Sequence, residues 1–451
     1  MIRSLILFWV AVPVFGQPLT LAQAVRGAIE RYPAIRVSQE QIAAASAGIS
    51  LARTAYLPKI DALAEINRAT RNNIFGMLLP QSVIPSISGP VIGSNNTGTV
   101  WGSAIGAMVS WEPVDFGLRR ANVDLAAATR AQSEAWLVRT KFEVAASAAD
   151  AYLTLVAAQE AVRAAQAGVE RAETVARTIT AQVSAELRPG ADQSRAEAEL
   201  AAARTQLIRT EQAVATARAN LAQYSGGEPA HLAVAAEGLL RPAPQAVPAT
   251  PDVSHNPIAA EQTAAVEQAR AQLHALERSY FPHFYLQGAV YARGTGADVN
   301  GSRYGGLNGL APTVQNFAVG VTVTFPVSDL PGLRAKEQAQ SATIRAQTAR
   351  SEQVALELRT QWNRAVAELD GARRVAANTP VQVTAARAAA QRATARYQAG
   401  LGNIDEVAEA QRLLTQAEID DALARLAVWR GLLGIAVAAG DIEPFLAEAG
   451  Q

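Results

Sequence analysis

Residues 317–325 read Phe-Ala-Val-Gly-Val-Thr-Val-Thr-Phe, a run in which large apolar side chains alternate with small or polar ones. Alternation with period two predicts a β-strand with two unlike faces. Three further stretches alternate in the same way, at residues 59–67, 103–111 and 284–293. Each has the length of a tilted strand that crosses a membrane, about 9–11 residues. Strands of a transmembrane β-barrel and half-buried hairpins of a soluble sandwich both fit this pattern.

The strand at residues 59–67 has one polar and one apolar face, as a strand between lipid and a water-filled lumen requires. Ile60 and Ile66 lie on the apolar face. The residues that would line the lumen are Lys59, Asp61, Glu65 and Asn67. Aromatic residues stand near the ends of the other strands, where membrane barrels carry aromatic girdles. These residues are Trp111, Phe284 and Phe325.

Each pair of predicted strands encloses a long loop rich in Gly, Ser, Asn and Pro, at residues 71–102 and 294–315. Loops of this length are uncommon in compact domains and usually carry function. Outer-membrane barrels place long loops outside the cell and short turns on the other side. Here the other side continues into helices instead of short turns, which is not typical of a simple barrel.

The chain is internally duplicated. Tyr56-Leu57-Pro58 returns 224 residues later as Tyr280-Phe281-Pro282. A period of this length indicates two copies of one large unit rather than a solenoid of short repeats. The predicted division is a first half at residues 17–225, a Pro-rich linker at 226–256, a second half at 257–440 and a C-terminal tail at 441–451.

Each half contains one helix that is too long for a globular domain. Residues 119–187 contain no Pro and a single Gly, and a helix of this length extends about 100 Å. Residues 333–398 repeat the pattern, with interruptions predicted near Gly371 and Pro380. A turn and a returning helix follow each long helix, and a single chain cannot bury both faces of such hairpins. The predicted helical hairpins are residues 116–224 and 332–439.

The composition argues against several classes of function. The chain has 451 residues, with 40 Lys and Arg against 40 Asp and Glu, so its formal net charge is zero. This balance argues against a nucleic-acid partner, whose phosphates need a basic surface. Cys is absent and the four His residues lack metal-ligand spacing, so we expect no metal site and no cofactor. Since no carboxylate stands in a catalytic pattern, we expect no catalytic residues and no enzyme activity.

The first 16 residues read as a secretory signal peptide. Arg3 supplies the positive charge, residues 5–14 form the apolar region, and small residues precede the cleavage site. The apolar run is too short for a membrane anchor, and without Cys the mature chain is not expected to carry an N-terminal lipid. Elsewhere the most apolar stretch is Leu432–Ala439, only eight residues long, which predicts no transmembrane helix.

Four strands do not close a barrel, and an open sheet edge is not tolerated in lipid because its unpaired backbone groups cost several kcal/mol each. Closure by identical copies gives eight, twelve or sixteen strands. About eight strands leave an interior filled by side chains, whereas a wider barrel encloses a lumen. Cyclic assembly would then place the helical hairpins side by side as a tube.

In their order along the chain, these motifs resemble the TolC family of outer-membrane efflux factors. The resemblance rests on the two Tyr-x-Pro junctions, on the strand exit at residues 111–117 and on two motifs at the hairpin tips, residues 190–200 and 397–407. It implies a mixed α and β fold: a homotrimer with a twelve-strand transmembrane β-barrel, four strands per protomer, continuous with a twelve-helix α-barrel. No single motif is specific, but their duplicated order is.

The resemblance also implies a function. Family members are passive exit ducts of tripartite efflux pumps in the outer membrane, joined through a periplasmic adaptor, the membrane fusion protein, to an inner-membrane transporter that supplies the energy. Two alternatives stay open on the sequence: the outer-membrane component of a type I protein secretion system, and a periplasmic coiled-coil protein that transports nothing.

By the same resemblance, acidic residues at the start of the last long helix would form the periplasmic gate and its selectivity filter. They are Asp405, Glu406 and Glu409. Rings of carboxylates attract cations. A structural explanation also fits, because Asn403 with Glu406 has the spacing of a helix-capping box.

The hairpin tips would contact the adaptor. The residues concerned are Arg188, Pro189, Gly190, Gly400, Leu401 and Gly402. At the first tip the sequence departs from the family, because Glu186 stands where the family usually has Gly. A plain structural reading, in which Gly only ends a helix, is compatible with the adaptor contact.

Overall fold

The computed structural model describes residues 18–70, 98–226, 228–241, 243–244, 251–297 and 303–450. The predicted signal peptide at residues 1–16 and most of the loop at 71–102 lie outside this range. The chain divides into two compact units. The helical unit comprises residues up to 43, 131–265 and from 347 onward; the strand unit comprises residues 44–130 and 266–346.

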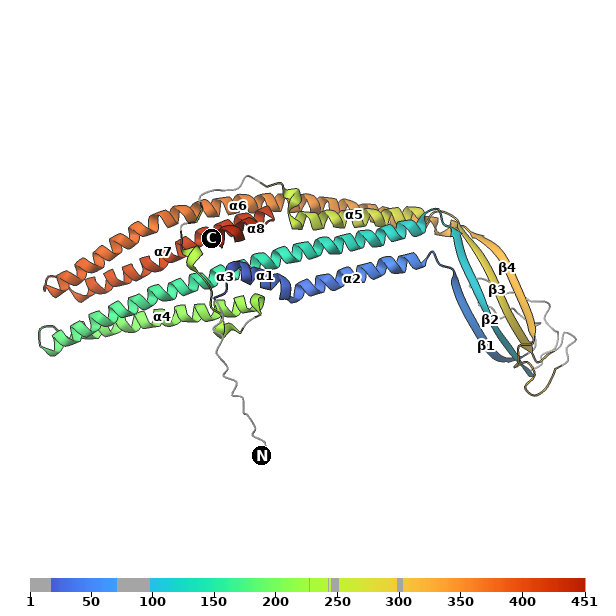
Figure 1. Cartoon of the computed structure of the whole chain (residues 1–451), viewed down its shortest axis with the longest axis horizontal. Coiled ribbons are helices and arrows are strands. Elements are labelled where there is room, and N and C mark those ends of the chain that lie inside the picture. Colours follow the sequence, from blue (N-terminus) through green and yellow to red (C-terminus); the bar gives the residue numbers. More distant parts are fainter. Residues whose placement is uncertain are drawn as a thin grey trace, which may run out of the picture. The chain divides into compact units, whose positions relative to one another are not determined.

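Among the described residues of the strand unit, four strands form one antiparallel sheet in the order β1-β2-β3-β4 (Figure 1). The strands are β1 Lys59–Thr70, β2 Thr99–Val114, β3 His283–Thr295 and β4 Val314–Thr324. The first three include the ranges expected from the sequence, whereas β4 begins three residues before the expected 317 and ends one residue before 325. Within the described chain β1 and β4 each pair with a single neighbour, so each has one open edge.

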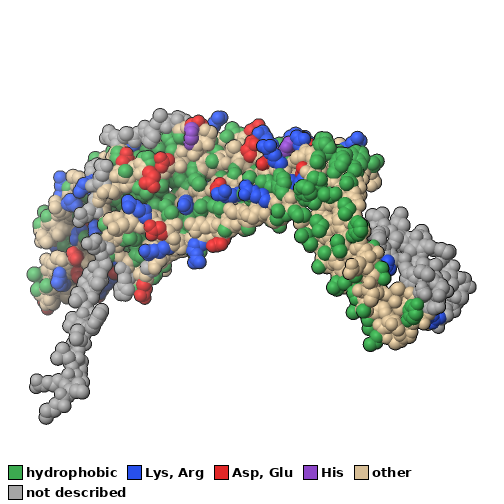
Figure 2. Space-filling view, turned by 45° about the vertical axis from the view of Figure 1, so that its right-hand side comes forward, with side chains coloured by type: hydrophobic (Ala, Val, Ile, Leu, Met, Phe, Trp, Pro, Cys, Tyr) green, Lys and Arg blue, Asp and Glu red, His purple; other side chains and the backbone are tan. Residues whose placement is uncertain are grey.

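The two faces of the sheet differ in character. One row across it places Ile60 beside Val109, Gly288 and Val319, and the adjacent row places Lys59 beside Ser110, Gln287 and Gly320. The apolar face is exposed: 81% of the Phe317 surface is accessible. In Figure 2 hydrophobic and uncharged side chains gather over the strands, while charged side chains are spread over the helices. A large exposed apolar face marks a surface that contacts lipid or other chains.

Each strand meets a helix at a tightly bonded junction, and the first is built around Tyr56. The indole of Trp111 donates a hydrogen bond to the Tyr56 carbonyl (3.1 Å), and the Arg119 guanidinium lies over the Tyr56 ring at 4.9 Å. Arg119 also binds the Asp115 carboxylate at 2.9 Å. Burial by itself raises the pKa of Asp115, but hydrogen bonds from Arg119 and Gly117 outweigh it and hold the pKa below its usual value.

Long helices dominate the chain. Their bounds are α1 Leu21–Arg31, α2 Pro33–Thr54, α3 Leu118–Ser184, α4 Gly190–Ser225, α5 Pro257–Arg278, α6 Leu330–Gln398, α7 Ile404–Ala439 and α8 Glu443–Ala449. In Figure 1, α3 with α4 and α6 with α7 form two hairpins, and α4 contacts α7.

The helix α6 is continuous through Gly371 and Pro380, so the predicted interruption is wrong. A proline inside a helix removes one backbone donor and usually bends or breaks the helix. Here the neighbouring helix holds the site, because the Thr379 hydroxyl donates a hydrogen bond of 2.8 Å to the buried carboxylate of Asp421 on α7. Packing along 69 residues therefore overrides the local preference.

The core of the helical unit is formed by α1, the middle of α3, the C-terminal half of α7 and α8. Tyr152 of α3 is fully buried, and its hydroxyl lies 2.8 Å from the carbonyl of Leu19 and 2.6 Å from that of Ala235. The helix α7 is long and apolar enough to cross a membrane. Its apolar residues, Trp429 among them, instead pack inside this core, as the sequence analysis expected of a chain without a helical span.

The segments predicted as linker and tail both contribute to this core. In the described part of residues 226–256, Leu239 is buried, and Val234 forms a β-bridge with Leu19. In residues 441–451 the helix α8 inserts Phe445, which packs edge-on against Trp429 at 6.4 Å between ring centres. Neither segment is a plain connection or an unstructured end.

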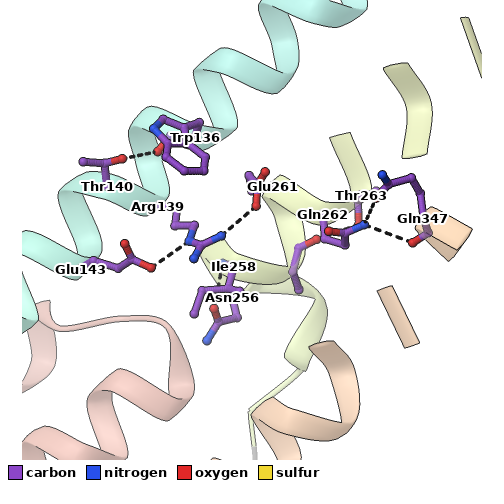
Figure 3. A network of polar contacts seen from close by, with 11 residues as sticks. Trp136, Arg139, Thr140, Glu143, Asn256, Ile258, Glu261, Gln262, Thr263 and Gln347 are labelled. Atoms are coloured by element: carbon purple, nitrogen blue, oxygen red, sulfur yellow. Dashed lines mark hydrogen bonds and ion pairs between the residues drawn. The ribbon is translucent and has the colours of Figure 1, made fainter. Parts of the chain in front are cut away.

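The start of α5 is fixed between α3 and α6 by polar contacts (Figure 3). Arg139 of α3 binds Glu143 of the same helix at 2.8 Å and Glu261 of α5 at 3.0 Å. On the other side of α5, the Gln262 amide donates to the side-chain oxygen of Gln347 on α6 at 2.9 Å. The hydrogen bond and charge of Glu143 are the main reasons that the pKa of Arg139 is raised, so this cation is permanent.

Candidate functional site at the hairpin tips

The two hairpin turns have the same backbone structure. At the end of α3, the Glu186 N–H donates to the Val183 carbonyl (3.0 Å) and the Leu187 N–H to that of Gln182 (2.9 Å). At the end of α6, the same two bonds recur 214 residues later, from Gly400 to Tyr397 (3.0 Å) and from Leu401 to Arg396 (2.8 Å). This pair of bonds defines a Schellman motif, whose penultimate residue takes a left-handed conformation.

The residue in the left-handed position differs between the two turns. Gly400 has φ 77°, which costs a glycine nothing, whereas Glu186 has φ 58°. Leu187 and Leu401 follow these residues, and each has 73% of its surface exposed. The departure at Glu186 that the sequence analysis noted is therefore a change of side chain on an unchanged turn.

The helix α7 begins with the cap that the sequence predicted. The Asn403 side chain accepts a hydrogen bond of 2.9 Å from the Glu406 N–H. The Glu406 carboxylate turns to Arg396, at 3.8 Å, which is 49% and 60% side-chain exposure for the two partners. By contrast α4 begins at Pro189 without a side-chain cap. The cap thus explains one bond of Glu406 and leaves its charge available to the surface.

Three residues join the two tips within one protomer, and we call them the tip clamp: Arg188, Asp192 and Tyr397. The Tyr397 hydroxyl donates a hydrogen bond of 2.8 Å to the Asp192 carboxylate on α4. The Arg188 guanidinium donates to the Tyr397 carbonyl and lies 4.3 Å from the centre of the Tyr397 ring. Only 3% of Tyr397 is exposed. The clamp therefore ties the end of α6 to the start of α4.

Burial raises the pKa of Tyr397 to about 12, and the hydrogen bond and negative charge of Asp192 act in the same direction while Arg188 opposes them. The phenol is accordingly a permanent donor to Asp192 at neutral pH. The sequence analysis did not select Tyr397 or Asp192 as site residues, although both lie inside the quoted tip motifs. Their pairing across 205 positions is invisible in a sequence pattern.

Each predicted gate carboxylate has an arginine nearby in the same protomer. Asp405 lies 3.3 Å from Arg195 of α4, Glu406 pairs with Arg396, and Glu409 pairs with Arg412 one turn further along α7. All these side chains are at least half exposed except Glu406, at 49%. Exposed ion pairs are weak and screened by salt, so they reduce the negative potential without removing it.

The remaining predicted tip residues surround these contacts. Pro189 and Gly190 are exposed, and Gly402 approaches the Glu406 carboxylate so closely that a Cβ atom would stand 3.2 Å from it. Above the tips a groove of about 290 Å³ separates the hairpins, lined by α3, α4 and α7. Small residues such as Gly168 and Ala196 allow this spacing.

The predicted lumen residues belong to the strand unit and lie together on one face of β1. Lys59, Asp61, Glu65 and Asn67 share the face of the rows that contain Ser110 and Gln287. Asn67 donates to Glu65 at 3.0 Å. Within the described ranges, no group of three His, Cys, Asp or Glu side chains has the arrangement of a metal site.

Comparison with known proteins identifies this architecture. Residues 24–227 and 253–441 match the outer membrane efflux protein family. The chain belongs to this family. This confirms the resemblance to TolC-like efflux factors drawn from the tip and junction motifs. No curated protein matches the chain by sequence.

Solved structures of outer-membrane channels share the fold. The channel OprN is similar with a TM-score of 0.73 at 21% identity, covering 93% of this chain and 89% of OprN. CmeC of Campylobacter jejuni gives 0.74 at 14% identity, with 93% and 85% covered. The MtrE channel of Neisseria gonorrhoeae, in its open state, gives 0.68 at 20% identity, with 93% and 89% covered. At these identities the likeness establishes the fold.

Proposed function

We propose that this protein is the outer-membrane exit duct of a tripartite efflux pump, through which substrates pass without chemical change. The observation that carries the proposal is the four-stranded sheet with one exposed apolar face, one polar face and two open edges. A sheet of this kind satisfies its backbone in lipid only when its edges meet those of other copies. The family match supports the same reading.

Three copies are the number that we propose. Two copies would give eight strands, whose interior is filled by side chains, and three give twelve, which leave room for a channel. Lys59, Asp61, Glu65 and Asn67 would then line the water-filled lumen. The helical hairpins of the three copies would form the periplasmic tunnel, a twelve-helix α-barrel. A cleaved signal peptide would export the chain, which carries no N-terminal lipid.

The tips are the proposed contact with a periplasmic adaptor, itself bound to an inner-membrane transporter that supplies the energy. Leu187 and Leu401 support this assignment, because exposed leucines on two matching turns form an apolar surface that a partner can cover. Arg188, Pro189, Gly190, Gly400 and Gly402 flank them.

The gate is proposed to be at the same end. Asp405, Glu406 and Glu409 stand in the first turns of α7, and the tip clamp holds the two hairpins together. Opening then requires the clamp to break in each protomer, so that the energy for opening comes from binding of the adaptor. The carboxylates would favour cations at the entrance.

The test is purification in detergent followed by conductance measurements in planar bilayers. We expect a heat-resistant complex with the mass of three chains in the outer-membrane fraction, and low conductance that rises when the clamp is removed. A stable, water-soluble monomer would contradict the proposal and favour a periplasmic coiled-coil protein. Dependence of drug export, rather than of protein secretion, on the gene separates the efflux duct from a type I secretion component.

A further inference from the structure

The first hairpin tip differs from the second in charge as well as in its turn residue. The second turn neutralises its own helix end, because Arg396 in the last turn of α6 donates to the Leu401 carbonyl at 3.1 Å. The matching position of the first turn is Gln182, whose side-chain oxygen is buried without a hydrogen-bond partner among the described residues. The last turn of α3 contains no basic residue.

Glu186 adds a negative charge to this uncapped end. Carbonyl groups concentrate negative partial charge at the C-terminus of a helix, where a cation is favourable and a carboxylate is not. Glu186 is exposed, and in the described part of the chain no hydrogen bond or ion pair engages its carboxylate. Arg188, two residues further on, is occupied by Tyr397.

Two local choices at residue 186 are therefore unfavourable to the isolated chain. A glutamate in the left-handed conformation is strained where glycine is not, and its charge adds to the negative end of α3. The matching turn, with Gly400 and Arg396, avoids both. Strain and unpaired charge that persist at one of two equivalent turns point to a contact outside the chain.

We infer that Glu186 and the end of α3 form a cation-binding contact for an Arg or Lys in the hairpin turn of the adaptor, beside the apolar contact of Leu187. This inference rests on the proposed function and deepens it. A cation placed there would pair with Glu186 and cap α3 at once, as Arg396 caps α6 internally. The two tips of each protomer then differ in specificity: the first selects a basic turn, and the second accepts an apolar one.

The experiment uses the full-length protein in cells, with the photoreactive amino acid p-benzoylphenylalanine in place of Leu187 or, separately, Leu401. After irradiation, mass spectrometry identifies the linked peptide. We expect both positions to cross-link the same adaptor, and the peptide linked at 187 to contain Arg or Lys in its turn. Glu186→Gln should lower the yield at 187 about three- to fivefold, and the yield at 401 less than twofold.

The variants separate charge from structure. Glu186→Gln keeps the left-handed side chain and its strain, so a lower yield reports the charge alone. Glu170→Gln, an exposed carboxylate on the same helix, is the matched control and should change neither yield. Glu186→Lys should abolish linking at 187, and replacing the adaptor's turn cation by Glu should restore it. Equal amounts of heat-resistant oligomer show that the variants fold.

Each outcome decides one claim. If linking at 187 is insensitive to Glu186→Gln, occurs at a peptide without a cation, or is absent while 401 links an adaptor, this inference is wrong and the proposed duct stands. If neither position links an adaptor in a protein that folds, the proposed adaptor contact fails, and the inference fails with it.

Discussion

Tyr397 shows how one hydroxyl can hold two parts of a duct together. Its pKa of about 12 lies above the ordinary value of 10.0, mainly because the side chain is buried. A group whose pKa is raised on folding contributes its stability fully below the ordinary pKa, and loses it as the pH rises through the folded value. The bond to Asp192 is therefore expected to persist up to about pH 10 and to weaken only above it.

Replacing Tyr397 by Phe should loosen the tip. The substitution keeps the ring that Arg188 covers and removes only the hydroxyl, so one hydrogen bond to a carboxylate is lost, worth about 1.5–3 kcal/mol. We expect a higher single-channel conductance in planar bilayers, with the same number of channels. Below pH 9 the conductance of the unmodified protein should show no step from Tyr397.

A second tyrosine supplies the control. Tyr280 also donates to a carboxylate, that of Glu337 at 2.8 Å, but in the strand unit. Tyr280→Phe should leave the conductance unchanged. If Tyr397→Phe conducts no better than Tyr280→Phe, the clamp does not close the duct.

At the scale of elements, α7 combines two tasks: its first turns carry the gate carboxylates, and its apolar half packs in the core. Both depend on how closely other helices approach it. A Cβ atom on Gly431 would lie 3.0 Å from the Cα atom of Leu369 on α6, whereas one on Gly434 would lie 3.6 Å from the nearest atom, of Ala365. Contacts near 3.0 Å require the neighbour to move, and a helix backbone moves only at a cost.

The two glycines give a matched pair of substitutions. Gly431→Ala should lower the free energy of unfolding by about 1–3 kcal/mol, because it overpacks the contact between α6 and α7. Gly434→Ala meets only ordinary contact and should stabilise the helix by up to about 1 kcal/mol. Thermal unfolding in detergent measures both. Equal effects of the two substitutions would contradict this account of the helix packing.

The gate carboxylates permit a direct electrical test. Glu406→Ala combined with Glu409→Ala should raise single-channel conductance and weaken block by divalent cations, since like charges at the entrance attract and retain cations. Because Arg396 and Arg412 stand beside these residues, block in the unmodified protein should be modest, and Arg412→Gln should strengthen it.

Carboxylates elsewhere on the hairpins serve as the control for this test. Glu170→Ala with Glu211→Ala removes the same charge from exposed positions of α3 and α4. Conductance and block should then stay as in the unmodified protein. If the gate variant behaves in the same way as this control, Glu406 and Glu409 are not part of a gate.

The whole molecule follows from features of the sequence to different degrees. Alternation located the four strands, but β2 extends to Thr99 and Val114 because Gly102 and Pro113 conceal its ends in a pattern of side chains. The hairpins were predicted from their missing prolines and their turns. Pro380 misled, since packing along α6 decides its conformation.

The site was less accessible from the sequence than the fold. The tip residues and the capping function of Asn403 follow from local rules. The pairing of Asp405 with Arg195 and of Tyr397 with Asp192 depends on two hairpins lying side by side, which no local pattern encodes. Prediction therefore reached the positions of the charges and missed their partners.

The unlike faces of the sheet yield a prediction for the assembled molecule. Val321 and Thr322 are neighbours on β4 that point to opposite faces. Val321→Arg places a charge on the apolar face, where 70% of Val321 is exposed, and near the middle of a bilayer this costs about 2–4 kcal/mol per copy. We expect little heat-resistant oligomer in the outer-membrane fraction.

The adjacent substitution is the control. Thr322→Arg places the same charge on the polar face, in the row of Tyr285, where water would solvate it. The oligomer should form in normal amount, with altered ion selectivity. Equal loss of both variants would show that the faces of the sheet do not separate lipid from water.

The two ends of the described chain meet in one core. The helix α1 near the beginning contacts α8 at the end, and Phe445 completes the packing around Trp429. This core cannot close until the final residues have left the ribosome, so the nascent polypeptide stays incomplete in structure throughout its synthesis. Delayed folding of this kind keeps a chain threadable, which is what passage through a narrow translocation pore demands.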